Sequence, residues 1–484
     1  MGLACSRRGS PKAMSGKLPA NLSKDSRNGS LEPRKSTGSS PGYAITSGFQ
    51  PRNAAAEEID IDESELCGIL GLPAHIIFDI FSRLPLKQVF LCRCTCKTLR
   101  RLISSPRYAV LSLDKAQPCL LLREYSRKQF PNFFDRKAYV TDLADETPST
   151  FFYSKAYLVD LEEAEDHVGS SDSNALVKHE IFSLPAGKLE LVGSCNGLVC
   201  LYQSKTGQYY ISNPLLGEWM ILPSPALKGA CSLICSFFGF CAKLKQFKIV
   251  RFTSASLLLS TAAVEITAVG ASSWRSIGDG PRPKARGSFS PSPAGDNILF
   301  TTGSSSQGSG SGSNIIYAFN LETEQFRPVP SPPHFSPEYL RKLSWVNVGV
   351  LRNSLCICYV HNESTLELWT AGSYNSNSNT NPIWTKKFST SFRYWYILFR
   401  MDKHHPAVFL DNNYDLWMKH EGTRNLYKFS PEIDEMRAFK VSGAGGTGFE
   451  IVAHVPSFVR LADSVGPEVD ELEVFRYGYK LWSP

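Results

Sequence analysis

The chain has 484 residues, 42% of them hydrophobic, and this length exceeds what one small core organises, so we expect roughly two to four domains. The formal net charge of +7 is mild, and no stripe of Lys and Arg interleaved with aromatic residues is present, which argues against a nucleic-acid-binding protein. The 13 cysteines are an odd number, the N-terminus lacks the apolar core of a secretory signal, and the most apolar stretch (residues 229–242) is too short to span a bilayer, so we expect an intracellular protein without a membrane span.

Residues 1–66 are predicted to form a disordered arm, because they are rich in Ser, Gly, Pro and charged residues, and residues 57–66 are an acidic, solvated lead-in. The first six residues fit the template for N-myristoylation at Gly2, with Cys5 available for a second acyl chain. Basic residues at positions 7, 8 and 12 would add attraction to an anionic membrane surface, since one acyl chain alone anchors a protein only marginally. From the sequence, lipidation and a chance match in a disordered tail both remain open.

A compact helical pattern begins at Leu72. Pro73 suits the first turn of a helix, and the apolar residues that follow recur along one helical face: Ile76, Ile77, Ile80, Phe81 and Leu84. A second short helix follows Pro85, and a third is closed by Pro106. Their periodic residues are Leu86, Val89, Phe90 and Arg93 in the second helix and Cys96, Leu99, Leu102 and Ile103 in the third. Three such short helices bury little surface, so the unit should dock on its own chain or give its apolar face to a partner.

The order and spacing of these residues resemble the plant F-box. The resemblance rests on LPAHIIFDIFSRLPLK at residues 72–87, RCTCK at 93–97 and LISSP at 102–106, and we delimit the F-box to residues 67–108. One departure is Leu99, where the family usually has Trp, so we expect weaker packing at this position without loss of the helix.

The F-box resemblance implies a partner, a Skp-type adaptor that links the chain to the cullin scaffold of a ubiquitin ligase. The mode of binding that it implies is burial of an apolar helix face in a groove. The residues implied to include the adaptor contacts are Leu72, Pro73, Ile76, Ile77, Ile80, Leu84, Pro85, Leu86, Val89 and Phe90.

After Tyr108 the chain consists of short β-rich runs separated by Gly, Pro, Asn and Ser, which predicts an all-β body. Bulky residues that follow a turn recur at intervals of 55, 52, 58 and 52 residues, at Trp219, Trp274, Phe326, Trp384 and Met436. A strand-like run precedes each of them, at Tyr209–Ser212, Val264–Ala268, Ile315–Asn320, Leu366–Trp369 and Asn425–Phe429. A period near fifty residues is typical of the four-stranded blades of a β-propeller, and the chain before residue 161 leaves room for a sixth blade.

This body resembles the F-box-associated domain of plant F-box proteins and, at the end of each period, a kelch-type blade. The residues that carry the first resemblance are GSCNGLVCL at 193–201, ISNP at 211–214 with Trp219, and FFGF at 237–240 before FKIV at 247–250. The glycine pair usual in kelch blades is missing. We delimit the propeller to residues 109–462 and a C-terminal tail to residues 463–484, and we expect flexible surface loops at Gly303–Ser313 and Tyr374–Asn381.

The cysteines suggest no metal site. Cys92, Cys94 and Cys96 lie two residues apart on a predicted helix, which turns each thiol about 200° from the last, so the three cannot converge on one ion. Cys356 and Cys358 share one face of a strand, where buried small residues need no metal.

The residues also suggest no catalytic group. The stretch GSCNG imitates a nucleophile elbow with Cys195 at the reactive position, but Asn196 and Gly197 precede another strand, as in a tight hairpin. His404 and His405 lie beside a proline with no carboxylate at ligand spacing, so we expect them to face solvent.

Together these patterns predict an α+β multidomain protein with a disordered arm, a small three-helix F-box and an all-β, kelch-like propeller. We interpret the chain as a non-catalytic substrate-recognition subunit of an SCF-type ubiquitin ligase in the cytoplasm or nucleus, which binds a Skp-type adaptor and, through the propeller, a protein target that the sequence does not identify. No cofactor is predicted. One alternative is a membrane-tethered propeller scaffold without a ligase role, and another is a propeller enzyme, which would need a cluster of metal ligands or nucleophiles at the hub that the sequence does not show.

Overall fold

The computed structural model divides into two compact units, Met1–Pro41 and Gly42–Pro484, and every residue that it describes belongs to the second. Gly2 and Cys5, the two expected surface loops, and His404 and His405 lie outside the described residues. The described residues are 71–116, 119–125, 154–159, 178–183, 189–225, 232–256, 259–284, 293–294, 296–302, 315–351, 354–362, 365–373, 382–391, 407–410, 415–419, 425–433, 435–440, 448–465 and 474–476.

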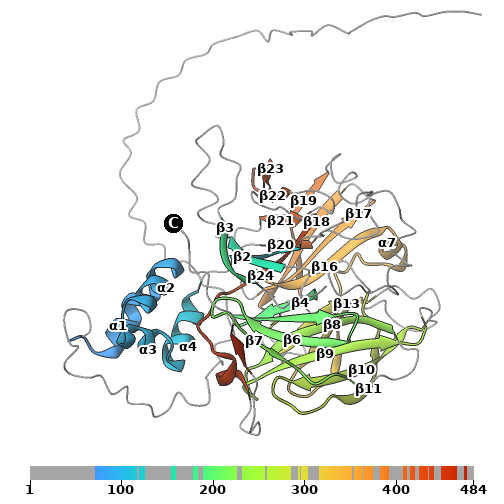
Figure 1. Ribbon diagram of the computed structural model, residues 1–484. Helices are drawn as coiled ribbons and strands as arrows, with labels where there is room; N and C mark the ends of the chain where they lie inside the picture. The colour runs from blue at the N-terminus through green and yellow to red at the C-terminus, as the bar shows by residue number, and fades with distance from the viewer. Residues whose placement is uncertain are drawn as a thin grey trace, which may run out of the picture. The chain divides into compact units, whose positions relative to one another are not determined.

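Four helices form the N-terminal part of the described chain (Figure 1). They are α1 (Ala74–Ser82), α2 (Leu86–Thr95), α3 (Lys97–Ile103) and α4 (Pro106–Lys115). Among the other described residues there are two short helices, α7 (Pro337–Arg341) and the 3₁₀ helix η3 (Leu461–Ser464).

The starts of the helices follow from local sequence. Pro73 and Pro85 directly precede α1 and α2, where a fixed φ and a missing N–H favour a helix start. The Cys96 thiol accepts a hydrogen bond from the Leu99 amide at the start of α3, and the Ser105 hydroxyl accepts one from the Tyr108 amide at the start of α4.

The three predicted helices are present, and α4 is an addition to them. The third helix ends before Pro106, as expected, but Pro106 also occupies the first turn of α4, where proline is favoured. The expectation of β-structure directly after Tyr108 is therefore wrong for residues 109–115. A Ser-Pro pair with Ser at the N-cap was the sequence signal for this helix.

The rest of the described chain forms six antiparallel sheets, numbered here as blades 1–6 in chain order. Blade 1 contains β24 (Gly448–His454), β1 (Cys119–Tyr125), β2 (Ser154–Val159) and β3 (Lys178–Ser183). Blade 2 contains β4 (Leu189–Cys195), β5 (Leu198–Gln203), β6 (Gln208–Asn213), β7 (Glu218–Ile221) and β25 (Phe475–Arg476), and blade 3 contains β8 (Ser232–Cys241), β9 (Gln246–Ser254), β10 (Thr261–Ala268) and β11 (Arg275–Pro281).

The last three blades repeat this plan. Blade 4 contains β12 (Pro293–Ala294), β13 (Asn297–Thr301), β14 (Ile316–Asn320) and β15 (Phe326–Val329). Blade 5 contains β16 (Leu343–Leu351), β17 (Ser354–His361), β18 (Thr365–Ser373) and β19 (Trp384–Ser391). Blade 6 contains β20 (Ala407–Leu410), β21 (Leu416–Lys419), β22 (Asn425–Ser430) and β23 (Glu435–Lys440).

The periodic bulky residues mark the same place in successive blades. Trp219, Phe326, Trp384 and Met436 lie at or near the start of a fourth strand, and Trp274 directly precedes one. Two of the indoles also join neighbouring blades, because Nε1 of Trp274 donates to the Pro223 carbonyl at 2.7 Å and Nε1 of Trp384 donates to the Pro330 carbonyl at 3.0 Å. The period of about fifty residues therefore reflects one repeated blade, as predicted.

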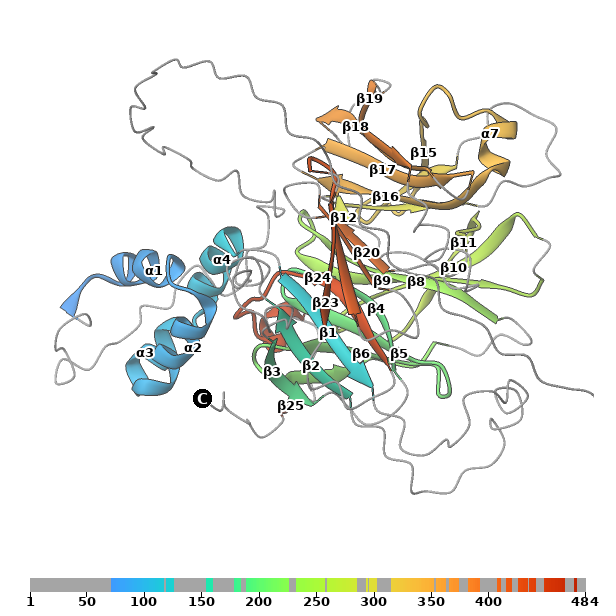
Figure 2. The same ribbon diagram turned by 90° about the horizontal axis from the view of Figure 1, so that it is seen from above.

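Blade 1 is completed by a strand from the far end of the chain. β24 pairs with β1 in antiparallel register, from Cys119 opposite His454 to Tyr125 opposite Gly448 (Figure 2). β24 also contacts β4 and β20, the first strands of blades 2 and 6, so it takes the place of a first strand in blade 1. The N-terminal part of the body thus supplies only three strands of blade 1. Pairing of β24 with β1 adds the fourth strand and closes the propeller.

None of the helices in the described part of the chain combines the length and the apolar character needed to cross a lipid bilayer.

Candidate functional site

The predicted adaptor-binding residues fall into three groups. Five are exposed on or beside α1 and α2: Leu72, Pro73, Ile76, Leu84 and Pro85. Ile80 and Leu86 are half-buried against the core. Ile77, Val89 and Phe90 are buried in the core of the four helices. In this conformation they pack beneath the exposed residues and do not themselves reach the surface.

Large apolar side chains face solvent on and beside two short helices. Leu72 and Ile76 are each 40% exposed and Leu84 is 37% exposed. Leu91 on α2 is 49% exposed, and sequence reasoning did not include it. Leu91 follows Phe90 directly, and only packing decides which of two consecutive apolar residues points outward. Such a surface is suited to burial against a partner protein.

The charges on this helical unit are asymmetric. Asp79 on α1 pairs with Arg83 and with Lys115 of α4, at 2.9 and 2.8 Å, and hydrogen bonds from Lys115 and Arg83 lower the pKa of Asp79 to about 2. From Ile80 to Leu113 the sequence has no acidic residue. The exposed basic residues of α3 and α4 include Lys97, Arg100, Arg101 and Arg107. The excess of positive charge on α3 and α4 therefore favours a partner with acidic groups.

A second site lies where the helices meet the propeller. The Tyr108 ring of α4 is 1% exposed and lies 5.7 Å, centroid to centroid, from Phe78 of α1 on one side and from Phe458 on the other. Phe458 belongs to residues 455–464, which follow β24 and which we call the strap. One continuous hydrophobic cluster contains the core of the four helices, residues of blades 2 and 3, and the strap residues Phe458, Val459 and Leu461.

Asn213 at the end of β6 holds the strap with its side-chain amide. Nδ2 donates to the carbonyls of Ser457 and Val459 at 3.0 and 2.6 Å, while Oδ1 accepts from the amides of Leu215 and Leu216. Asn213 is fully buried, and the amide side chain is well satisfied, with both a donor and an acceptor role used. The Asn of the ISNP motif therefore joins blade 2 to a segment 244 residues away.

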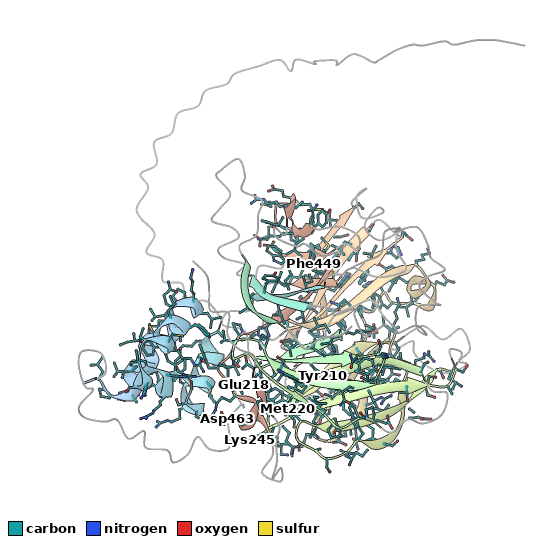
Figure 3. All side chains as sticks on the ribbon, in the orientation of Figure 1. Tyr210, Glu218, Met220, Lys245, Phe449 and Asp463 are labelled. Carbon is teal, nitrogen blue, oxygen red and sulfur yellow. The ribbon has the colours of Figure 1, made fainter. Side chains whose placement is uncertain are left out.

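Two further residues of the predicted family motifs contact the strap. Asn196 and Gly197 form the two-residue turn between β4 and β5 with φ values of 46° and 82°, which confirms the predicted tight hairpin. A Cβ at Gly197 would lie 1.8 Å from Oγ of Ser457, so only glycine fits. Glu218 of β7, which is labelled in Figure 3, is 4% exposed, and its carboxylate accepts a hydrogen bond from the Leu461 amide at 3.0 Å.

The residues that imitate reactive groups are buried and inert. Burial raises the pKa of the Cys195 thiol to about 12, so no thiolate forms there near neutral pH. Cys356 and Cys358 lie in β17 within one apolar cluster, as expected for small core residues. Within the described residues, no group of three or more His, Cys, Asp or Glu side chains is arranged to hold a metal ion.

Sequence reasoning missed the strap. The sequence places residues 455–462 in the propeller body and residues 463–464 in the C-terminal tail, and it does not predict the fourth helix, so neither Phe458 nor its contact with Tyr108 was anticipated. A signal was present in VPSFVRL at residues 455–461, where apolar residues continue beyond the last strand-like run. β25 is a similar case, because it lies in the expected tail and adds a fifth strand beside β7.

Comparison with known proteins identifies both parts of the chain. The family model of the F-box associated beta propeller domain matches residues 153–461, and that of the F-box domain matches residues 69–110. The chain is 23% identical to the F-box protein At3g07870 of Arabidopsis thaliana over 347 residues, which cover 66% of this chain and 73% of that protein. It is 25% identical to the putative F-box protein At3g16210 of Arabidopsis thaliana over 266 residues, or 54% of this chain and 61% of that protein.

Among solved structures, a chain of the nidogen/laminin complex aligns with 69% of this chain and 98% of its own length, at 12% identity and a TM-score of 0.36. A likeness at that score carries no inference about this protein.

Proposed function

This chain belongs to the F-box associated beta-propeller family, and from that premise we propose that it is the substrate-recognition subunit of a Skp–cullin–F-box ubiquitin ligase. The F-box would bind a Skp-type adaptor and, through it, a cullin. The propeller would bind the protein to be ubiquitinated. The chain itself would transfer no ubiquitin, and its contribution to the reaction would be proximity, because it holds the target near a charged conjugating enzyme.

The observation that carries the proposal is the set of apolar side chains left in solvent on and beside α1 and α2. Leu72, Ile76, Leu84 and Leu91 are 37–49% exposed on a helical unit that has its own buried core. Burial of the exposed part of one such side chain in a partner contributes roughly 1 kcal/mol. The basic character of α3 and α4 adds a preference for an acidic partner and would mainly speed association.

The test is adaptor capture with exposed residues as the sites of mutation. A charge at half-buried Ile80 would disturb the core of the helices as well as the surface, whereas Ile76→Glu changes a side chain that is 40% exposed. We expect Ile76→Glu with Leu91→Glu to abolish capture of a Skp-type adaptor. Ile383→Glu is the matched control, because Ile383 is 83% exposed on the propeller body and lies far along the chain from the F-box.

Two outcomes would refute the ligase role. One is failure of the wild-type chain to bind any Skp-type adaptor, and the other is unchanged binding by the Ile76→Glu, Leu91→Glu double variant when its melting temperature matches the wild type. The target would then be sought by affinity capture with the proteasome blocked, comparing the wild type with the double variant. A target should accumulate on the variant's propeller, since recognition persists while ubiquitination is lost.

A separate proposal concerns the N-terminus. We propose acylation at Gly2 and Cys5, supported by the MGLACS start and the basic residues at positions 7, 8 and 12, with association to the plasma membrane as its consequence. Gly2→Ala and Cys5→Ser should each lower the membrane-bound fraction. If neither does, the motif is a chance match. Residence in the cytoplasm or nucleus and a kelch-type repeat are likewise proposals, and imaging of the Gly2→Ala variant tests the first.

A further inference from the structure

We propose that the strap is a positioning element that docks the F-box on blade 2, so that the F-box and the propeller behave as one rigid body. The inference rests on the proposed function for its meaning, because a rigid connection fixes the distance between a bound adaptor and a bound target. Its structural content stands independently, in contacts among described residues.

The first support is that the strap is held by blade 2 through groups that leave it little freedom. Two carbonyls of the strap accept hydrogen bonds from the Asn213 side-chain amide. The Leu461 amide of the strap donates one to the Glu218 carboxylate. The turn at Gly197 approaches Ser457 so closely that no other residue fits. Within the strap, Arg460 forms a two-point ion pair with Asp463 at 2.8 and 2.9 Å. The buried hydrogen bonds of Asn213 and Glu218 to the strap are costly to break, because each would leave an unpaired group.

The second support is that the other face of the strap meets the F-box. Phe458 is 2% exposed and contacts Tyr108, which in turn contacts Phe78 and Phe81 at 5.7 and 6.5 Å. A chain of aromatic contacts therefore runs from the strap into the core of the F-box. Aromatic pairs contribute beyond their buried area, and this chain is fully desolvated.

The third support is the position of the strap in the sequence. It begins at residue 455, directly after β24, and β24 completes blade 1. The same continuous segment thus closes the propeller and then docks the F-box. A propeller that has not captured β24 cannot place the strap, so docking of the F-box reports a completed propeller.

The chain supplies a matched control for a test. Asn320 ends β14 as Asn213 ends β6, and its Oδ1 accepts the amides of Glu322 and Thr323 in the same kind of turn. Its Nδ2, however, reaches Asn297 within its own blade at 3.3 Å. Asn→Asp at either site keeps the turn acceptor and removes the amide donor. Only at Asn213 does the new carboxylate face two strap carbonyls.

The experiment measures the distance distribution between spin labels on non-cysteine handles at exposed Arg100 of α3 and exposed Ile383 of the propeller, in the full chain. We expect one narrow distribution for the wild type and for Asn320→Asp, and a broad one for Asn213→Asp. Loss of the buried hydrogen bonds between Asn213 and the strap should allow the strap to open more often. Hydrogen exchange at the Leu461 amide of the strap should therefore be about tenfold faster in Asn213→Asp than in the wild type. Phe458→Ala, which leaves the Asn213 bonds in place, should also broaden the distribution and covers the case in which Asn213→Asp does not fold.

A broad distribution in the wild type would overturn the inference, as would a narrow one in Phe458→Ala. Capture of the Skp-type adaptor by the unlabelled forms of the same variants separates the two proposals. Adaptor binding that persists in Phe458→Ala together with a broad distribution is the expected result. Loss of adaptor binding in the wild type would refute the ligase role and leave the distance result standing.

Discussion

Ser194 and His454 form a buried hydrogen bond, with Oγ and Nδ1 2.8 Å apart, between the first strands of blades 1 and 2. His454 is 1% exposed, and its Nε2 has no hydrogen-bond partner among the residues that the structure describes. Burial lowers the pKa of His454 to about 3, because the charged imidazolium would be desolvated. The closing strand of the propeller therefore carries a histidine that the fold keeps neutral.

Acid should destabilise the protein through His454. His454 takes up a proton near pH 6.5 in the unfolded chain but only near pH 3 in the folded chain. The free energy of unfolding therefore has its full value above about pH 6.5 and decreases as the pH falls toward 3. The expected slope in that window is about 1.4 kcal/mol per pH unit for this group alone. Urea denaturation at several pH values should show a shallower slope for His454→Gln. Ser194→Ala, which leaves the imidazole buried, should keep the wild-type slope, and an unchanged slope in His454→Gln would contradict the assignment.

Gly197→Ala should destabilise the protein more than Gly207→Ala. Both glycines have positive φ, 82° and 73°, so each substitution carries backbone strain of about 1 kcal/mol. Only at Gly197 would the new Cβ overlap Ser457, and we expect a total loss of roughly 3 kcal/mol or more from the free energy of unfolding. Addition of Ser457→Gly should bring the Gly197→Ala variant close to the Gly207→Ala value. Equal losses at the two glycines would exclude the contact.

Lys248 should matter far more than Lys243, although both pair with a glutamate across blades 3 and 4. Nζ of Lys248 is buried and donates to the Leu321 carbonyl at 2.7 Å and to Glu324 at 2.8 Å. Lys248→Met leaves these acceptors with fewer donors, and we expect a loss of roughly 2 kcal/mol or more in chemical denaturation. Lys243→Met removes an exposed pair with Glu322 and should change stability little. A larger loss of stability in Lys243→Met than in Lys248→Met would show that the buried pair does not hold blades 3 and 4 together.

Leu99 is the position at which the chain departs from the usual F-box sequence. Its side chain is 9% exposed within the core of the four helices, so the expected role as an apolar residue of α3 is confirmed. Leu99→Ala should reduce the free energy of unfolding of the F-box by about 2–4 kcal/mol, measured by thermal melting. Cys94→Ala, at an exposed position on α2, is the control and should have little effect. Retention of full stability by Leu99→Ala would show that α3 does not depend on this side chain.

Several features of the fold could be predicted because they are encoded locally. Helical spacing around Ile77 and Phe81 predicted α1, and the proline boundaries of the helices are visible as single residues. The hairpin at Asn196 and Gly197 follows from the need for positive φ at both positions. The recurrence of Trp219, Trp274 and their equivalents predicted the blades, since each blade repeats the same turn before its fourth strand.

The sequence by itself determined the first three helices, the repeated blade and the family motifs, since these depend on spacing within a few tens of residues. The tertiary structure alone decided that Ile76 faces solvent while its neighbour Ile77 is buried, that β24 closes blade 1, and that Asn213 binds the strap. The physical reason is distance along the chain. Asn213 and Ser457 are 244 residues apart. Nothing in the sequence around Asn213 identifies the Ser457 carbonyl as its acceptor, because only folding brings the two groups within 3.0 Å.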